Sequence, residues 1–484
     1  MREKFFENDF GLRLEKWANE YGSVYKLPIG LGRSHVILCD PKAITHFHAK
    51  DGFTYLRHPF LKAVLEMFLG HSMVTTDKDD HKRLRRMVVP AFTSTSLRSV
   101  LNVFYDCTHK APLLLISRGD SAKTLIRLDC IGIAGFGHDF KALEGHKSAV
   151  TEAFEAFETL NDPESFHLFM LIGNLIPQIV NIPMKSGRLF KKLKTTLSEI
   201  AENLLQESRS ENHVQENKSI LGLLLKGQSD TNINFSRSDR ILCAIFSIIL
   251  TLGFLVTLSV SSNDSVSLYD HLSMEQWALV ELSRNQAVQN RLRKELNQSS
   301  TGDPTWDQLM SGLPYLDAVV HETLRFYPPL DEIAREAGED DIIPLSRPLE
   351  LASGETVNAI SVPKGTIVVS PITFTNLCEE FWGPDSRKFI PERWLDGNPC
   401  RCQDLLGHRH LYTFSDGPRM CLGRVFALTE IKAVLSVLIR NFTFELLNGP
   451  ETKIGVHRSS IMPRPKLAGE IGTHLPMRVR PVVR

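Results

Sequence analysis

The stretch FSDGPRMCLG, residues 414–423, places Cys421 between two glycines and directly ahead of a long helical pattern. Gly417 and Gly423 permit turns or close backbone approach that a side chain would block. The helix is predicted because apolar residues recur at three- and four-residue intervals, at Leu422, Val425, Phe426, Ile431, Val434, Leu435 and Leu438. We therefore expect Cys421 in a tight loop at a helix N-terminus, where the helix dipole and backbone N–H groups stabilise a thiolate.

A single cysteine in a turn has two interpretations. Free cysteine is most often buried and inert, and on that ground alone Cys421 is a structural residue. In the other interpretation it is a thiolate ligand, and Arg419 pairs with an anionic group of the molecule that the thiolate holds. The residues around the cysteine decide between the two.

The loop is similar to the haem-ligand loop of the cytochrome P-450 superfamily, the haem-thiolate monooxygenases. Its pattern, Phe414-x-x-Gly417-x-Arg419-x-Cys421-x-Gly423, matches the family pattern at every fixed position. The resemblance implies haem b as the cofactor, Cys421 as the axial thiolate that binds its iron, and the other four residues as parts of the cofactor-binding loop. Thiolate donation favours cleavage of the O–O bond of dioxygen. That chemistry belongs to the cofactor, so no side chain is assigned a catalytic role.

Two more segments occur in the family's order. Glu322-Thr-Leu-Arg325 resembles the E-x-x-R helix, and Pro391-Glu-Arg393-Trp394 resembles the P-E-R-W segment. Glu322 and Arg325 are three residues apart, so they can meet on one helix face. With Arg393 they would form a buried charge network that is costly to break. The resemblance implies that this network braces the loop that presents Cys421 and has a structural role.

The segment His81-Lys-Arg-Leu-Arg85 resembles the family helix that holds a haem propionate. On its residues alone this is a basic, solvated helix face. By resemblance, His81 and Arg85 donate to a propionate, assisted by Arg335 in IAREA and by Arg419. Arginine suits the task because its planar fork matches a carboxylate bidentately. Many family members carry tryptophan at the position of His81.

Secondary-structure patterns favour a mainly α chain with small β-sheets, an α+β fold. Helical patterns cover residues 79–92, 97–117, 148–159, 189–205, 275–296 and 313–326, and strand patterns cover 24–27, 35–39, 355–359, 366–369 and the C-terminal LPMRVRPVV. Asp40 and Pro41 are expected to open a helix, as cap and first residue. The resemblance implies one cytochrome P-450 domain over residues 1–484, with haem between a central long helix and the cysteine loop.

Composition narrows the function classes. The 484 residues carry zero formal net charge, with 42% apolar and 23% charged residues. This balance argues against a nucleic-acid binder that relies on bulk electrostatics. The eight cysteines show no framework spacing, which fits a reducing compartment better than a disulfide scaffold.

A second metal motif competes with the haem loop. Cys400, Cys402, His408 and His410 cluster just before it, and four nitrogen and sulfur ligands can bind zinc. The spacing is not that of a standard zinc finger. We therefore favour an exposed loop over a zinc site.

The sequence departs from the family at the central helix. Family members carry an acid and a threonine there, which relay protons to bound oxygen. The segment from Trp277 matches the distal half of that helix, but the family spacing places Tyr269 and Asp270 where the acid–threonine pair should stand. Residues up to Gly253 resemble the proximal half. Residues 254–273 are surplus and lack helical periodicity, so we interpret them as an insert from a gene-model error.

Two apolar runs raise the question of membrane contact. Residues 241–260 carry no charge and are long enough to span a bilayer. They are a membrane span, a core helix, or a core helix joined to an artefact. Residues 169–184 fall where the family's membrane-dipping loop lies, and core packing explains them equally well. The N-terminus shows no signal or anchor pattern. The resemblance implies the cytosolic face of the endoplasmic reticulum membrane, with the family's anchor helix missing.

The resemblance predicts a haem-dependent monooxygenase of the microsomal fungal type. It would insert one oxygen atom from O2 into a small apolar substrate, with electrons from NADPH-cytochrome P-450 reductase, in secondary metabolism such as terpenoid biosynthesis. Two alternatives remain. One is a haem-binding protein that is catalytically impaired because the oxygen-relay motif is missing. The other is a haem enzyme that needs no reductase. The sequence does not identify the substrate, because a fold does not specify its ligand.

Overall fold

The computed structural model describes residues 10–117, 132–136 and 273–482, with gaps at 31, 70, 300–301, 396–400, 458–463 and 471–474, together with the single residues 173, 195, 199, 219 and 220. The chain divides into two compact units. Unit 1 comprises Met1–Lys62, Asp77–Lys82 and His321–Cys421, and unit 2 comprises Ala63–Thr76, Arg83–Val320 and Leu422–Arg484.

The main sheet of unit 1 has five strands in the order β1-β2-β7-β4-β3. In chain order they are β1 (Val24–Gly30), β2 (Arg33–Leu38), β3 (Tyr55–Leu56), β4 (Ile333–Ala337) and β7 (Ile367–Ser370). The hairpin predicted from the first two strand patterns is confirmed, with Val24 opposite Leu38. β2 pairs in parallel with β7 and β4 pairs antiparallel to it. The sheet therefore joins the start of the chain to segments that follow residue 330.

The helices assigned wholly to unit 1 are short. They are α1 (Phe10–Tyr21), α2 (Pro41–Ala49), α16 (Ile372–Leu377) and α17 (Glu379–Trp382). α2 begins as predicted: Asp40 accepts a hydrogen bond from the N–H of Ala43 at 3.0 Å, and Pro41 is the first helical residue. Its apolar face is buried through Ile44 and Phe47, which fixes α2 within the unit.

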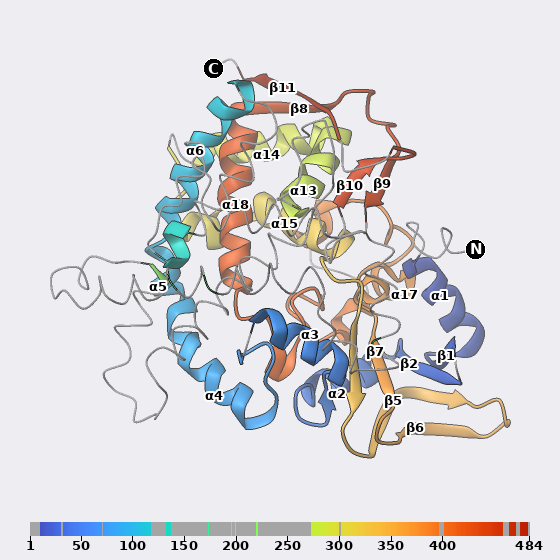
Figure 1. Cartoon of the computed structure of the whole chain (residues 1–484). Helices are drawn as coiled ribbons and strands as arrows, with labels where there is room; N and C mark the ends of the chain where they lie inside the picture. Colours follow the sequence, from blue (N-terminus) through green and yellow to red (C-terminus); the bar gives the residue numbers. More distant parts are fainter. Residues whose placement is uncertain are drawn as a thin grey trace. The chain divides into compact units, whose positions relative to one another are not determined.

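A long hairpin, β5 (Asp341–Glu350) and β6 (Thr356–Val362), extends from unit 1 at the lower right of Figure 1. The sequence patterns found only the second of these strands. β5 carries two prolines, which remove ladder donors and suppress a strand pattern. The register shifts between Pro344 and Leu349, so the prolines lie at an irregular stretch of the hairpin.

Unit 2 is mainly helical. Its helices include α5 (Ser94–Arg98), α6 (Leu101–Ser117), α13 (Ser273–Arg284), α14 (Gln286–Ser299) and α18 (Arg424–Asn441), while α3 (Pro59–Leu69), α4 (Lys78–Val88) and α15 (Pro314–Phe326) run from one unit into the other. The helix predicted after Cys421 is α18, and most of its residues are buried. It packs along α6 (Figure 1), where the rings of Phe104 and Phe426 meet edge to face at 4.9 Å.

Two small antiparallel sheets complete the described part of unit 2. β8 (Phe442–Leu446) pairs with β11 (Met477–Pro481), and β9 (Ile454–His457) pairs with β10 (Arg464–Leu467). The C-terminal strand expected from the sequence is therefore confirmed as β11. Together with the helices, these sheets confirm the predicted fold class, mainly α with small β-sheets.

Three predicted helices are shorter than their sequence patterns. The helix over 275–296 breaks at Asn285, whose side chain accepts a hydrogen bond from the N–H of Val288 and caps α14. The helix over 79–92 ends at Val88, and Pro90 lies in a 3₁₀ turn that follows. The helix over 97–117 is divided, because α5 ends at Arg98 and α6 begins at Leu101.

Several predicted segments lie almost entirely outside the described residues. They are the helices over 148–159 and 189–205, the apolar runs 169–184 and 241–260, and the surplus residues 254–273. Their interpretations stay predictions, as does the single domain over 1–484.

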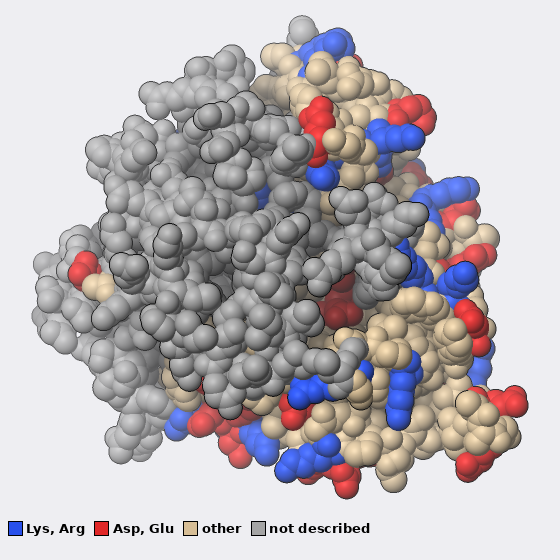
Figure 2. Space-filling view, turned by 45° about the vertical axis from the view of Figure 1, so that its right-hand side comes forward, with Lys and Arg blue, Asp and Glu red and all other residues tan. Residues whose placement is uncertain are grey.

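The described surface carries both signs of charge. On the face shown in Figure 2, lysine and arginine side chains alternate with aspartate and glutamate side chains, in keeping with the zero net charge. Of the helices that the structure describes, none combines the length and the apolar character needed to cross a bilayer.

Candidate functional site

The cysteine loop in unit 1 closes on itself through backbone hydrogen bonds. The N–H of Cys421 donates to the carbonyl of Phe414 at 2.8 Å, and Gly417–Arg419 form a 3₁₀ turn between them. Cys421 is a half-buried cysteine three residues before the first residue of α18. Phe414 is buried. The tight loop expected ahead of a helix is therefore present.

The two glycines of the loop differ in their roles. Gly417 has a φ of +65°, and a Cβ there would collide with the carbonyl oxygen of His48 on α2. Glycine is required at position 417 for two reasons: the backbone is in the left-handed region, and the carbonyl of His48 leaves no room for a side chain. Gly423 has a φ of −81°, which any residue adopts. Gly423 therefore needs no special turn conformation, and its expected role in close backbone approach stays a prediction. It is the N-cap residue of α18, and its carbonyl accepts from the N–H of Ala427.

Two of the predicted propionate-binding arginines lie in unit 1 and hold aspartates. Arg335 on β4 makes a bidentate pair with Asp51, with Nε to Oδ1 at 2.7 Å and Nη2 to Oδ2 at 3.1 Å. Arg419 in the cysteine loop pairs with Asp77 at 2.5 Å. Gly52 makes room for this guanidinium, because a Cβ at Gly52 would collide with Nε of Arg419. Both arginines are thus fixed in place by neighbouring carboxylates.

A third arginine, Arg57, joins this group, and the sequence patterns did not find it. Its Nη1 is buried and has no hydrogen-bond partner among the described residues. Burial, and then the positive charges of Arg335 and Arg419, lower the pKa of Arg57 to about 9, partly offset by Asp51 and Asp77. The guanidinium still carries its charge at neutral pH. Arg57 stands alone in a loop with no periodic spacing to other basic residues, so no sequence signal pointed to it.

The arginine cluster, defined as Arg57, Arg335 and Arg419 with Asp51 and Asp77, therefore has an excess of positive charge. Three guanidinium groups face two carboxylates, and an isolated buried charge is costly unless an opposite charge accompanies it. An anionic carboxylate of a ligand would complete the set. The residues present fit the propionate side of a haem.

The other two predicted propionate donors lie on α4. His81 is buried and Arg85 is half-buried, one helical turn further along. The helix face is thus not simply the solvated surface that its basic residues alone suggest. The role of both side chains toward a propionate stays a prediction.

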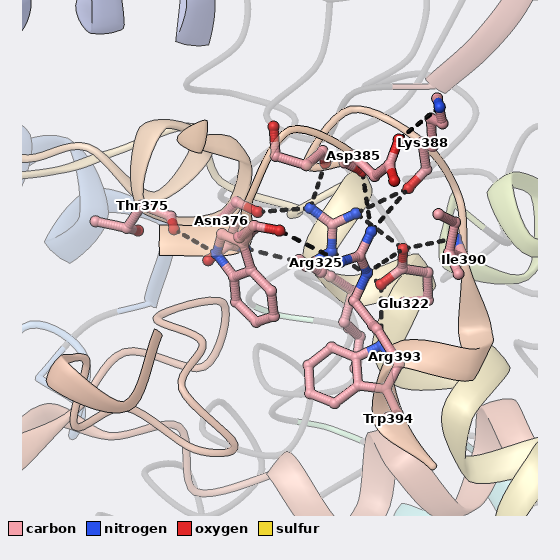
Figure 3. A network of polar contacts seen from close by, with 12 residues as sticks. Glu322, Arg325, Thr375, Asn376, Asp385, Lys388, Ile390, Arg393 and Trp394 are labelled. Carbon is pink, nitrogen blue, oxygen red and sulfur yellow. Dashed lines mark hydrogen bonds and ion pairs between the residues drawn. The ribbon is translucent and has the colours of Figure 1, made fainter. Parts of the chain in front are cut away.

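The network predicted from the E-x-x-R and P-E-R-W segments is confirmed. In Figure 3 the carboxylate of Glu322 lies beside two guanidinium groups, to which dashed lines connect it. It accepts from Nε and Nη2 of Arg325, both at 2.8 Å, and from Nε of Arg393 at 3.1 Å. The backbone N–H of Ile390 and Nε1 of Trp394 complete its partners at 2.8 and 2.9 Å. The indole of Trp394 is a partner that the sequence analysis did not assign.

This network leaves no charged nitrogen of Arg325 unsatisfied. Besides Glu322, its guanidinium donates to the carbonyl oxygens of Asn376, Ser386 and Lys388. Burial acts to raise the pKa of Glu322, but the paired Arg325 and Arg393 and the N–H of Ile390 hold it below its usual range. The network therefore ties α15 to the segment from residue 376 to residue 394 within unit 1.

The competing metal motif lies in a stretch that is only partly the exposed loop that we favoured. Cys402 is fully buried, while His408 and His410 are half-buried, and Cys400 lies outside the described residues. Within the described ranges, no group of three or more metal-binding side chains converges on one point. Cys402 is therefore packed in the core of unit 1.

Comparisons with known proteins show the family of the chain. The family model of cytochrome P450 matches residues 3–251 and 271–468. Cytochrome P450 monooxygenase claP of Ampulloclitocybe clavipes is 41% identical, over 98% of this chain and 89% of its own length. Cytochrome P450 monooxygenase claW of the same organism is 40% identical, over 97% and 87%. Ganoderic acid synthetase CYP5150L8 of Ganoderma lucidum is 28% identical, over 90% and 83%. The chain belongs to the cytochrome P450 family.

Membership confirms several expectations from the sequence. The cofactor is haem b with an axial cysteine thiolate, and the protein is an oxidoreductase of the monooxygenase class. The family also implies dioxygen, an organic substrate and a redox partner. The cysteine loop and the arginine cluster are the described features of this chain that fit such a cofactor.

Proposed function

We propose that Cys421 binds the haem iron of this monooxygenase and that Arg57, Arg335 and Arg419 bind the haem propionates. The observation that carries the proposal is the buried excess of positive charge in the arginine cluster, one member of which, Arg419, lies two residues from the cysteine. A propionate offers the bidentate oxygens that guanidinium groups prefer. The assignment of His81 and Arg85 to the same propionates rests on the family resemblance.

Haem b supplies the activation of dioxygen when bound. The protein's own residues hold and orient it. The loop hydrogen bond between Phe414 and Cys421 fixes the backbone that carries the thiolate, and Gly417 lets that loop lie against α2. The arginine cluster would hold the propionates of the bound haem. Glu322 and its hydrogen-bond partners hold unit 1 in the shape that the cysteine loop and the arginine cluster need.

The substrate and the electron donor are also proposals. We expect a small apolar metabolite of fungal secondary metabolism, of the terpenoid type, and electrons from NADPH-cytochrome P450 reductase at the cytosolic face of the endoplasmic reticulum membrane, with peripheral membrane contact. The fungal relatives support this view, and one of them is named for the synthesis of ganoderic acid.

Turnover with a purified reductase tests the proposed function. The full chain, with NADPH, reductase and a panel of terpenoid hydrocarbons, should yield a product that carries one oxygen atom from isotopically labelled O2. Omission of the reductase should abolish it. Product formed with peroxide alone, at the same rate as with reductase and NADPH, would favour the reductase-independent alternative.

We further propose that much of the segment 254–273 does not belong to the native protein. The family model leaves residues 252–270 unmatched while it covers the sequence on both sides, which supports the proposal. Sequencing the mature transcript across codons 250–275 tests it. A spliced message that restores an acid–threonine pair is the expected result, and a message that encodes every residue would contradict it.

The same unmatched segment favours a second candidate function. If residues 254–273 are real, the chain lacks the acid–threonine pair at the family position and would bind haem but activate oxygen poorly. Such a protein would show the thiolate-haem spectrum and consume NADPH without forming an oxygenated product. Coupled turnover by the full chain would exclude this candidate.

A further inference from the structure

His48 on α2 is a buried histidine with a polar contact at each ring nitrogen. Its Nε2 lies 3.0 Å from the hydroxyl of Ser370 on β7, and its Nδ1 lies 3.4 Å from the hydroxyl of Ser415 in the cysteine loop. The imidazole stacks on the ring of Tyr412, with centroids 4.6 Å apart and planes 12° from parallel. All four residues belong to unit 1.

These contacts surround the stretch that leads to Cys421. Tyr412 and Ser415 lie on either side of Phe414, whose carbonyl accepts the N–H of Cys421. The backbone of the loop also touches His48, because Gly417 lies against its carbonyl group too closely for any Cβ. His48 therefore contacts the cysteine loop in three ways: its ring stacks on Tyr412, its Nδ1 lies near Ser415, and its backbone carbonyl lies against Gly417.

The conformation of Ser415 is a second, independent observation. Its φ is +58°, in the left-handed region that glycine adopts without strain and other residues rarely adopt. A glycine would suit this backbone better, so the serine is justified by what its side chain contributes. Its hydroxyl points to His48, which makes the contact between the two side chains the evident contribution.

The charge state of His48 agrees with a positioning role. Burial, opposed by Asp51 and assisted by Arg335, lowers the pKa of His48 to about 4. The neutral ring then has one donor and one acceptor nitrogen, and either serine hydroxyl can match either of them. A neutral ring also adds no further positive charge to the arginine cluster beside it.

We infer that His48 is a positioning residue that connects the cysteine loop to β7 and so fixes the direction of the Cys421 thiolate. The inference rests on the proposed role of Cys421 as the haem ligand. Its side chain has no part in the proposed binding of the propionates and touches no reacting atom. Loss of its polar contacts should leave the chain folded but let the thiolate leave the iron more readily.

Three substitutions of His48 separate its contacts. His48→Phe keeps a ring against Tyr412 but removes both hydrogen bonds. His48→Asn retains a polar atom near the position of Nδ1, which faces Ser415, and His48→Gln retains one near the position of Nε2, which faces Ser370. The readout is the lifetime, at a fixed temperature, of the carbon-monoxide difference band of the reduced thiolate haem. His48→Phe should shorten it about fivefold, as expected when the one hydrogen bond from the ring to the cysteine loop, that with Ser415, is lost. His48→Asn should restore more of the lifetime than His48→Gln.

The serine provides a matched test. Ser415→Ala should shorten the lifetime in wild-type background but have no further effect in His48→Phe, because the two side chains share one contact. The thermal unfolding midpoint of each variant serves as the readout for general stability. An independent, additive effect of Ser415→Ala would overturn the inference, and so would equal lifetimes for His48→Asn and His48→Gln.

Failure of the inference is distinguishable from failure of the proposed function. If Cys421→Ser keeps the thiolate band, the proposed haem ligand is wrong. If Cys421→Ser loses the band and a folded, haem-loaded His48→Phe protein keeps the wild-type lifetime, only the role of His48 is wrong. Should His48→Phe not load haem, the comparison of Ser415→Ala with wild type, alone and combined with His48→Gln, which lacks the contact with Ser415, decides the matter by the same criteria.

Discussion

Unit 1 contains two groups of buried and half-buried arginines that are built in opposite ways. In the network around Glu322, Arg325 finds an acceptor for each guanidinium nitrogen within the protein (Figure 3). In the arginine cluster, Arg57 keeps a buried nitrogen without a partner among the described residues, and positive charge exceeds negative charge. The first group is complete without a ligand, and the second is not. A closed network serves structure, and an open one indicates a binding site for an anion.

The largest effect is expected where the closed network is broken. Glu322→Ala leaves Arg325 and Arg393 buried without their carboxylate, which should cost about 3–5 kcal/mol in the free energy of unfolding. The variant should be recovered as apoprotein or aggregate. Chemical unfolding and haem content measure the effect, and a well-folded, haem-loaded Glu322→Ala protein would show that the network is peripheral.

The arginine cluster should respond differently when one of its arginines is replaced. Arg57→Met removes a buried charge that lacks a full partner, so the apoprotein should unfold at the same midpoint or higher. Haem should leave the variant about tenfold to a hundredfold faster, since hydrogen bonds to charged groups are strong. Transfer of haem to a scavenging apoprotein gives the rate.

Lys62→Met is the matched control for Arg57→Met. Lys62 also reaches Asp77, at 3.3 Å, but its side chain is more than a third exposed. An exposed pair contributes little, so haem loss should stay at the wild-type rate. If Arg57→Met destabilised the apoprotein as Glu322→Ala does, the cluster would be structural and the contrast between the two groups would fail.

The stability of the fold at acid pH should depend on the network around Glu322. The pKa of Glu322 is lower in the folded chain than in the unfolded chain, so its contribution is present above the unfolded value, about 4.3. That contribution is lost as the pH falls through the lower, folded pKa. Unfolding midpoints measured below pH 5 should therefore fall steeply. A double variant in which Glu322→Gln is combined with Arg393→Met should show a shallower fall if it folds, and an unchanged slope would mean that other carboxylates dominate.

The smallest effect is expected at the edge of the network. Trp394→Phe removes the indole N–H that donates to Glu322, while four other donors to this carboxylate remain. The free energy of unfolding should fall by about 1 kcal/mol, the net value of one hydrogen bond. A loss as large as that of Glu322→Ala would show that the indole is an essential member.

The sequence predicted the network around Glu322 better than the arginine cluster, for a physical reason. Glu322 and Arg325 share one helix turn, and Arg393 belongs to a segment with its own pattern, so local spacing revealed them. Arg57 comes from a loop without periodicity, and only the folding of distant segments around Asp51 and Asp77 brings it beside Arg419. Tertiary proximity of single residues leaves no trace in one sequence.

The same distinction explains the errors in the fold. The hairpin β1–β2, the cap at Asp40 and the helix after Cys421 follow from local patterns and are confirmed. The break at Asn285 lies inside an unbroken apolar periodicity, so the pattern could not place it. The burial of Cys402 in a polar stretch depends on which elements cover it, which composition does not tell.

The central claim is that Cys421 supplies the thiolate that binds the haem iron. The carbon-monoxide difference spectrum of the reduced protein tests it most directly, with Cys421→Ser and Cys402→Ser expressed beside the wild type. Cys421→Ser should lose the band typical of thiolate-bound haem, whereas Cys402→Ser, whose residue lies in the core of the same unit, should keep it. An unchanged band in Cys421→Ser would contradict the account.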